Sequence, residues 1–203
     1  MVDDAAPRVP PPHEIIIVPP PEHEDRTALL QQCIQVRIDV FVHEQGFPVE
    51  VEVDEHDPTA THWLLRLVPS LKPIGTIRAH RVDLVGNSYY KLTRLVVLKE
   101  YRHYKFGGNL VLALHDWVKD DARKSGIVDF VKVVCHSQAV RADSGGAVAF
   151  YRKYDVIVMG TATLYRLTAW FSSLRFRYEE EGDLFDEDGE PHQKMVVRLS
   201  LSE

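Results

Sequence analysis

Residues 92–126 constrain the fold of this chain most, because they join a buried strand to a long helix through a short basic turn. Residues 95–98 form an apolar run with β-branched residues at its centre, which is typical of a buried strand. A cationic turn with two glycines follows at 101–108, and apolar residues then recur at helical spacing until Gly126. The first amide groups of a helix have no partner within it, and the helix dipole favours negative charge there. The segment is therefore either an anion site or an ordinary connection between a strand and a helix.

The pattern of apolar residues predicts strands and helices on both sides of this stretch. Alternating or β-branched runs bounded by turn residues indicate strands, and apolar residues three or four apart indicate helices. The expected strands are 15–18, 62–68, 74–82, 89–98, 131–136, 176–180 and 195–199, with an acidic turn at 183–190, and the expected helices are about 25–44, about 107–124 and one at 147–154. This order, β-α-βββ-α-β-α-β-β, predicts an α+β fold with a mixed, mainly antiparallel sheet.

Length and composition describe an ordinary globular protein of 203 residues. One domain is expected at 13–203, preceded by a loose tail at 1–12 that is rich in proline. The net charge of −6, with no basic stripe, speaks against nucleic acid as a partner, and no apolar stretch is long enough for a membrane helix. Cys33 and Cys135 are far apart in apolar surroundings, which predicts buried free thiols and a cytoplasmic or nucleocytoplasmic location.

Residues 47–58 alternate valine with carboxylate between Pro48 and Pro58. The alternation is compatible with an edge strand, but the flanking prolines favour an extended loop. A solvated acidic connection is one interpretation of this loop. The other is a mouth that attracts a cationic amine substrate.

Several reaction centres are excluded by the sequence itself. It contains no GxxxxGK[ST], GxGxxG or GxSxG motif. The histidines lack the spacing of zinc ligands and there is no Cys-x-x-Cys, so no metal site is predicted. The Ser144-Gly145-Gly146 segment is interpreted as a turn rather than as a nucleophile.

The chain resembles the GCN5-related N-acetyltransferases (GNAT), which use acetyl-CoA. Their cofactor signature, Arg/Gln-x-x-Gly-x-Gly/Ala, is similar to Arg102-His103-Tyr104-Lys105-Phe106-Gly107, although Lys105 stands where the family usually has glycine. Residues 41–48 (FVHEQGFP) look like a subgroup with an FVxEQ segment after the first helix, and 136–138, 150–153 and 187–195 resemble later family motifs. The resemblance covers about residues 15–199. It implies a GNAT-like central sheet with helices on both faces.

The resemblance implies direct transfer of an acetyl group from acetyl-CoA to an amine. Backbone amides of the strand around Leu95, Val96 and Val97 would hold the pantetheine and polarise the thioester carbonyl. The diphosphate would lie in a cradle made by Arg102, His103, Tyr104, Lys105, Phe106, Gly107, Gly108 and Asn109. No metal is implied.

Tyr151 matches the family's tyrosine that can protonate the leaving sulfur, and this role is favoured over the alternative of an aromatic ring packed on the sheet. Many members carry a glutamate as general base on the fourth strand, where this chain has Thr93. Glu44, His80 and His136 are alternative bases, as is a chain of water molecules, and Glu44 is the predicted base.

Residues 154–173 interrupt the family pattern, because removing about twenty residues joins 151–153 to 174–176 as a typical family sequence. This stretch is interpreted either as a lid or oligomer contact anchored by Trp170 and Phe171, or as a retained intron. A shorter excess of about five residues lies at 141–145.

The leading hypothesis is an acetyl-CoA-dependent N-acetyltransferase that acts on a primary amine of a small molecule or peptide. One alternative is a non-catalytic acyl-CoA-binding or interaction module, because Lys105, Thr93 and the insertion depart from the family pattern. Another is acetylation of protein N-termini or lysines. Dimers are common among similar proteins, so a homodimer is a further expectation.

Overall fold

The computed structural model describes residues 9–85, 87–138, 178–187 and 190–202. Its strands form one mixed sheet in the order β1-β2-β3-β4-β5-β8-β6, with β7 paired to β8. The pair β4–β5 is parallel, whereas β1–β2, β2–β3, β5–β8, β6–β8 and β7–β8 are antiparallel. The bounds are β1 His13–Ile17, β2 Thr61–Leu67, β3 Pro73–Val82, β4 Tyr89–Val97, β5 Phe130–Gln138, β6 Glu179–Glu180, β7 Phe185–Glu187 and β8 Glu190–Ser200. The predicted mainly antiparallel sheet is confirmed.

The helices agree with the sequence pattern in extent but not always in type. Helix α1 spans Arg26–Arg37 and continues as the π-helix η1 over Ile38–Glu44, so the predicted helix at 25–44 is confirmed with a widened second half. The Gln45 amide donates to the Val40 carbonyl at 3.0 Å, five residues back, and Gly46 ends the helix with φ +82°. Helix α2 spans Phe106–Lys124, as expected from its apolar spacing.

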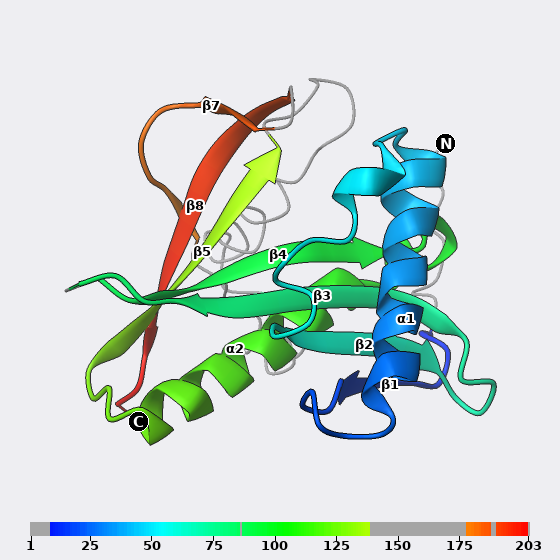
Figure 1. Cartoon of the computed structure of the whole chain (residues 1–203), viewed down its shortest axis with the longest axis horizontal. Coiled ribbons are helices and arrows are strands. Elements are labelled where there is room, and N and C mark those ends of the chain that lie inside the picture. Colours follow the sequence, from blue (N-terminus) through cyan, green and yellow to red (C-terminus); the bar gives the residue numbers. More distant parts are fainter. Residues whose placement is uncertain (1–8, 86, 139–177, 188–189, 203) are drawn as a thin grey trace, which may run out of the picture. The chain divides into compact units, whose positions relative to one another are not determined.

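The described chain divides into two compact units, which are considered separately. The first comprises residues 1–80 and 93–114, and the second comprises residues 81–92 and 115–203. Figure 1 shows the elements of both, coloured along the sequence.

In the first unit, α1 packs against β2 (Figure 1). Cys33, Leu64 and Val18 form a core cluster there, and Cys33 is fully buried with a free thiol. Burial raises the pKa of that thiol to about 11, so it stays protonated at neutral pH. The prediction of buried free cysteines is confirmed for both residues of this type.

Two arginines of α1, Arg26 and Arg37, are buried, although the apolar spacing of the helix does not predict their burial. The Arg26 guanidinium donates to the carbonyls of Pro19 and Pro58 at 2.7 Å and of Asp57 and Ala60 at 3.2 Å. Because carbonyl groups of two loops share one cation, Arg26 fastens both loops to the start of α1.

In the second unit, β5 and β8 pair over nine residues and lie side by side (Figure 1). The prediction of an acidic turn at 183–190 is partly wrong, because Phe185–Glu187 form the short strand β7. That segment pairs with β8 from Phe185 opposite His192 to Glu187 opposite Glu190, so the turn itself is narrower. The available backbone partners on β8 outweigh the low strand propensity of acidic residues.

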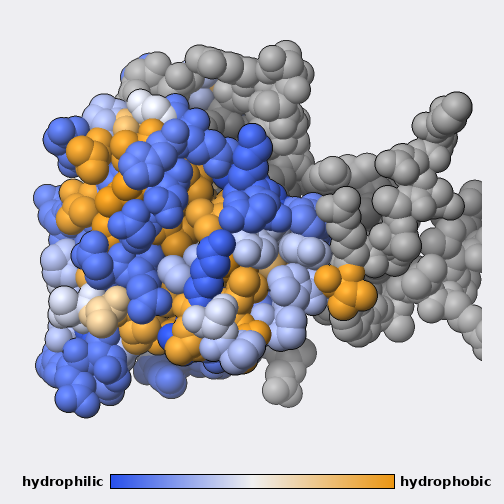
Figure 2. Space-filling model, turned by 90° about the vertical axis from the view of Figure 1, so that its right-hand side faces the viewer, coloured by the Kyte–Doolittle hydropathy of each residue, from blue (hydrophilic) through white to orange (hydrophobic). Residues whose placement is uncertain are grey.

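Figure 2 shows one face of the molecule, on which hydrophobic patches alternate with hydrophilic ones over the described residues. No helix within the described ranges is both long enough and apolar enough to cross a membrane.

Candidate functional site

Strand β4 changes its backbone conformation at Arg94, directly before the predicted thioester platform. Arg94 has φ +55°, a left-handed conformation that costs energy for any residue except glycine and breaks a regular strand. Val96 and Val97 after it are buried and Leu95 is half-buried. The break therefore reorients the backbone at the three residues that the sequence predicts as the platform.

A glycine on the neighbouring strand lies against this platform. A Cβ atom at Gly75 of β3 would lie 3.2 Å from the Val96 carbonyl oxygen and 3.1 Å from the Leu65 side chain. A side chain at Gly75 would force these neighbours to shift by a few tenths of an ångström, so its absence suits the close packing of β3 against β4. This packing fixes the position of the β4 backbone near Val96.

The turn after β4 is a 3₁₀-helix, η3 (Lys99–Tyr104), which leads into α2. Phe106 is fully buried and its ring packs on those of Tyr104 and His13, with centroids 5.5 and 4.5 Å away. The amides of Gly108 and Asn109 donate to the Lys105 carbonyl at 2.9 and 3.4 Å. The predicted cradle residues thus form one continuous local structure, in which His103 and Lys105 are exposed and Gly107 is half-buried.

Lys105 occupies the left-handed region with φ +61° and ψ +21°, between η3 and α2. The signature that the sequence resembles has glycine at this position, where this chain has lysine. Glycine adopts positive φ without steric cost, whereas lysine loses roughly 1–2 kcal/mol there. Lys105 therefore holds a backbone conformation that glycine would adopt at lower cost.

Replacing Lys105 by glycine is expected to raise the free energy of unfolding by up to about 1 kcal/mol, because relief of strain exceeds the added chain entropy. With the diphosphate of acetyl-CoA at this turn, as the resemblance of the sequence implies, the KM for acetyl-CoA should rise several-fold, because a positive charge beside it is lost. Chemical denaturation and steady-state kinetics measure both quantities. Lys105→Ala is the matched control, since it removes the charge but keeps the strain. Equal stability of the two variants would contradict this account of Lys105.

Arg102 is held by protein groups on three of its nitrogens. Its Nε donates to the Val97 carbonyl at 2.8 Å, and Nη1 and Nη2 donate to the two carboxylate oxygens of Glu44 at 2.7 and 2.6 Å. The hydrogen bond from Arg102 holds the pKa of Glu44 below its usual range. Glu44 is therefore ionised at neutral pH, but it is a weaker proton acceptor than a free carboxylate. Its clearest structural effect is to orient Arg102.

Glu44→Gln is expected to raise the KM for acetyl-CoA about tenfold, because the amide holds Arg102 less firmly than the carboxylate. The kcat should change less than tenfold. Initial rates at varied acetyl-CoA and fixed amine measure both constants. A fall of 100-fold or more in kcat with an unchanged KM would instead identify Glu44 as the general base that its sequence position suggests.

The acidic segment 47–58 is neither an edge strand nor an extended loop throughout. Val49–Val51 form the short 3₁₀-helix η2, and turns follow it. Three of its carboxylates point to arginines of the first unit. Asp57 accepts from Arg37 at 2.7 and 3.2 Å and from Arg78 at 2.8 Å.

The remaining members complete a buried network of alternating charge. Arg78 also donates to both oxygens of Asp54 at 2.6 and 2.7 Å, and Arg94 donates to Asp54 at 3.3 Å. Glu52, 2% exposed, lies 3.5 Å from Arg37 and 4.0 Å from Arg94. Burial raises the pKa of Glu52, whereas for Asp57 the nearby arginines outweigh burial and lower the pKa. The sequence left two interpretations of the segment 47–58, a solvated acidic connection or an acidic mouth for a cationic amine. These three carboxylates fit neither of them, because arginines bind all three.

His62 belongs to the edge of the same network. Its Nε2 lies 3.0 Å from the Asp57 carbonyl, and the ring is 1% exposed. Burial lowers the pKa of His62 to about 4, so the ring is neutral at physiological pH.

The other predicted catalytic residues lie elsewhere or outside the described residues. His80 stacks on His56 in the first unit, with ring centroids 4.2 Å apart. In the second unit, His136 Nδ1 lies 2.9 Å from a Glu187 carboxylate oxygen, and this contact lowers the pKa of Glu187 although burial opposes it. Tyr151, the helix at 147–154, the excess at 141–145 and the insertion at 154–173 fall outside the described residues.

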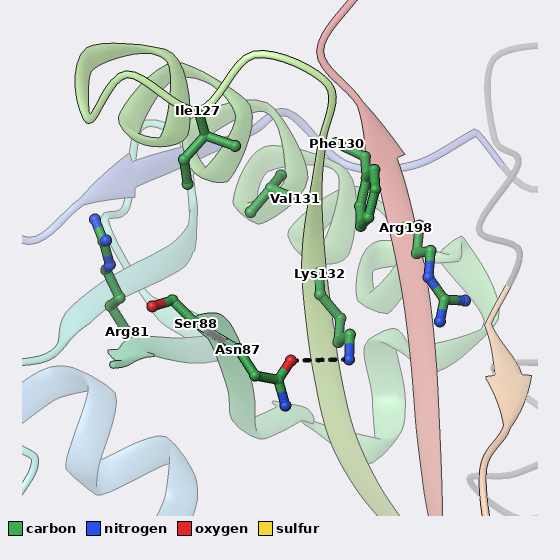
Figure 3. Close-up of a pocket in the computed structure, with 8 residues that line it drawn as sticks. All are labelled: Arg81, Asn87, Ser88, Ile127, Phe130, Val131, Lys132 and Arg198. Carbon is green, nitrogen blue, oxygen red and sulfur yellow. Dashed lines mark hydrogen bonds between the residues drawn. The ribbon is translucent and has the colours of Figure 1, made fainter. Parts of the chain in front are cut away.

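A cavity of about 400 Å³ opens in the second unit (Figure 3). Lys132 of β5 donates to the Asn87 side chain at 3.2 Å across one side of it, and Phe130 and Arg198 lie at another side. The predicted cradle and platform residues do not line this cavity. Within the described ranges, no cluster of three histidine, cysteine or carboxylate side chains is placed to hold a metal ion.

Comparison with known proteins agrees with this architecture. The model of the acetyltransferase (GNAT) family matches residues 30–156. YjcF of Bacillus subtilis, named as an uncharacterized N-acetyltransferase, is 31% identical over 130 residues, which cover 64% of this chain and 79% of that protein.

Two solved structures share the fold at low sequence identity. One is a candidate N-acetyltransferase from Lactobacillus plantarum, with a TM-score of 0.61, 23% identity, and coverage of 93% of this chain and 99% of that one. The other is an acyl-CoA N-acyltransferase from Pseudomonas aeruginosa, with a TM-score of 0.55, 17% identity, and coverage of 91% and 98%.

Proposed function

Because this chain belongs to the acetyltransferase (GNAT) family, we propose that it transfers the acetyl group of acetyl-CoA to a primary amine. The observation that carries the proposal is the backbone at Lys105. A residue in the left-handed region joins η3 to α2 at the position where the family signature has glycine. This backbone supports the proposal, because a tight turn that leads directly into a helix N-terminus suits a bound phosphate.

In this proposal, residues of the first unit hold the cofactor. The start of α2 supplies amides of Phe106 and Gly107 to the diphosphate, where the helix dipole favours negative charge. Arg102, oriented by Glu44 and the Val97 carbonyl, and Lys105 add positive charge at the same turn. Acetyl-CoA is a co-substrate here, and no metal takes part.

The chemistry proposed is a direct attack of a neutral amine on the thioester carbonyl carbon. Backbone amides at residues 95–97, beyond the break at Arg94, polarise the carbonyl oxygen. The amine nitrogen gives one proton to a base, for which an ordered water chain is proposed, because both carboxylate oxygens of Glu44 are bound by Arg102. As the carbon–sulfur bond breaks, the hydroxyl of Tyr151 protonates the leaving sulfur.

The test is release of the CoA thiol from acetyl-CoA in the presence of a panel of primary amines, with mass spectrometry of the product. An N-acetylated amine together with free CoA would support the proposal. Calorimetric binding of CoA without turnover of any small amine or peptide would point to a non-catalytic module. Acetylation of peptides alone would point to a protein acetyltransferase.

The same assay separates acetyl from longer acyl groups. Propionyl-CoA and butyryl-CoA are compared with acetyl-CoA at equal concentration. A higher kcat/KM for a longer chain would overturn the acetyl assignment but leave acyl transfer intact.

A further inference from the structure

The cavity of about 400 Å³ in the second unit has no part in the proposed function, since neither the cradle nor the platform lines it. Its walls come from the end of β3, the turn between β3 and β4, the connection from α2 to β5, and β8 (Figure 3). A volume of this size lies within the range of small-molecule sites in proteins. The cavity can therefore hold a small organic molecule.

The charged side chains that line this cavity are all positive. Among the described residues, its lining includes Arg81, Lys132 and Arg198 but no carboxylate. The whole chain has a net charge of −6, so a cavity lined by cations alone runs against the balance of the molecule. Such a cavity has a positive potential that attracts an anion.

Two of these cations face each other across the sheet. Lys132 of β5 lies directly opposite Arg198 of β8 in the antiparallel register. Side chains at opposite positions lie on the same face of a sheet, and like charges placed in this way destabilise a strand pair. An anion bound between the two side chains would turn this unfavourable contact into a favourable one.

The third cation, Arg81, is already paired. Its Nε donates to Asp83 at 2.8 Å, and its Nη1 donates to the Ser125 hydroxyl at 3.0 Å. Arg81 therefore adds less to the positive potential of the cavity than Lys132 and Arg198 do.

Glu181 is the carboxylate on which Lys132 and Arg198 act. The hydrogen bond from Lys194 is the main reason that the pKa of Glu181 is lowered, and the charges of Lys132 and Arg198 add to this effect. Lys194 Nζ lies 2.6 Å from a Glu181 carboxylate oxygen. Because Glu181 is paired with Lys194, it does not neutralise the other two cations, and the cavity keeps an excess of positive charge.

Neutral side chains complete the lining with two kinds of surface. Lys132 Nζ donates to the Asn87 side-chain oxygen at 3.2 Å, and Ser88 lines the cavity next to Asn87 (Figure 3). Phe130 lies two residues before Lys132 on β5, so the two side chains share a face, and Phe130 is 52% exposed. The amide and hydroxyl groups can donate hydrogen bonds to an anion, and the phenyl ring offers a flat apolar surface.

We propose that this cavity binds a small phosphate monoester with an aromatic body. A phosphate dianion balances the two charges of Lys132 and Arg198, and a guanidinium can bind two of its oxygens at once. The aromatic body packs on Phe130. This site uses no residue of the cradle or the platform, so it is a second binding site that does not depend on the proposed function.

The experiment measures the binding of phenyl phosphate to the full chain by isothermal titration calorimetry at low ionic strength. In the Lys132→Gln/Arg198→Gln double variant the dissociation constant should rise about tenfold or more, because two charge-assisted contacts are lost. Benzoate and inorganic phosphate should bind the wild-type chain more weakly than phenyl phosphate, since benzoate carries a single charge and inorganic phosphate has no ring. Equal affinity for either of them would overturn the proposed ligand class.

Arg123→Gln/Lys194→Gln is the matched control, because it removes the same number of positive charges from the second unit outside the cavity lining. The two side chains are 45% and 41% exposed and are paired with Asp120 and Glu181. The control should leave the dissociation constant for phenyl phosphate within about twofold, because exposed charges at a distance are screened. Equal weakening in the two double variants would mean that net charge alone attracts the anion, and it would overturn the proposal.

Thermal unfolding gives a readout that does not depend on the heat of binding. Phenyl phosphate should raise the unfolding midpoint of the wild-type chain but not that of Lys132→Gln/Arg198→Gln. Without ligand, the double variant should unfold at the same temperature as the wild type or higher, because the contact between like charges is removed. A lower midpoint would show that the two cations stabilise the strand pair, and it would overturn the proposal.

Repeating the titration with saturating CoA separates this site from the proposed cofactor site. The affinity for phenyl phosphate should be unchanged, because the two ligands occupy different places. Loss of binding in the presence of CoA would place the probe at the cofactor turn and overturn the proposal, as would absence of binding to the wild-type chain. Failure of acetyl transfer to any amine, with phenyl phosphate binding intact, would refute the proposed function but support this second site.

Discussion

Replacing Asp57 by asparagine is expected to lower the free energy of unfolding by about 3–5 kcal/mol. Asp57 is 2% exposed and accepts hydrogen bonds from Arg37, from Arg78 and from the Asp54 amide. Without its negative charge, two guanidinium groups that are 1% and 3% exposed would lose their shared partner. Arg78 would keep Asp54 and Arg37 would keep Glu52 at 3.5 Å, but the network would be left with three cations and two carboxylates. An excess buried cation costs far more than a lost surface ion pair, so the effect should be among the largest that a single carboxylate can produce in this chain.

Urea denaturation at neutral pH measures the loss, and a thermal midpoint on the order of 10 °C lower should accompany it. Asp83→Asn is the matched control, because Asp83 is also paired with an arginine, Arg81 at 2.8 Å, but its side chain is 64% exposed. That variant should change the free energy of unfolding by less than about 1 kcal/mol. An equal loss of unfolding free energy in the two variants would mean that burial of the network does not increase the contribution of Asp57 to stability.

Tyr151→Phe is expected to lower kcat by about 10²–10⁴-fold while the dissociation constant for CoA stays within threefold. The phenol holds its proton at neutral pH and can give it to the departing thiolate, whereas a phenyl ring has the same shape but no proton to give. Removing an interaction made only in the transition state lowers kcat and leaves ground-state binding intact.

Steady-state kinetics and calorimetry with CoA separate the two effects, and Tyr89→Phe on β4 serves as the control for loss of a hydroxyl elsewhere. The pH profile gives a second readout, because the basic limb of kcat should disappear if the phenol is the acid. An unchanged kcat in Tyr151→Phe would assign the proton to water and leave Tyr151 a packing role.

The strands that cross the core could be predicted because their side chains alternate or are continuously apolar between clear turns. β2, β3 and β4 lie where the pattern places them, within one residue at each end. Strand β7 could not be predicted from the sequence, because an acidic stretch becomes a strand only when β8 offers it backbone partners. Likewise, periodicity finds the helix at 25–44 but not its π-helical second half, which depends on hydrogen bonds five residues apart.

The candidate site likewise has features that local sequence predicts and features that it does not. The turn from β4 to α2 follows from local sequence, because a strand, a basic turn and a helix start must follow one another along the chain. The partners of the side chains in this turn do not follow from local sequence, because the pairing of Arg102 with Glu44 joins residues 58 positions apart. The arginine network is hidden for a further reason. Arg37 and Arg78 count as polar in any periodicity, so their burial depends on carboxylates that the fold supplies.

The burial of Glu52 and Asp57 within residues 49–57 has a consequence for how this protein can change. These two carboxylates are committed to folding, whereas Val49, Val51 and Val53 carry little of the stability because they already face solvent. A library randomised only at Val49, Val51 and Val53 should therefore yield mostly folded proteins. The same stretch of chain thus combines buried anchoring carboxylates with variable positions, an arrangement well suited to diversification.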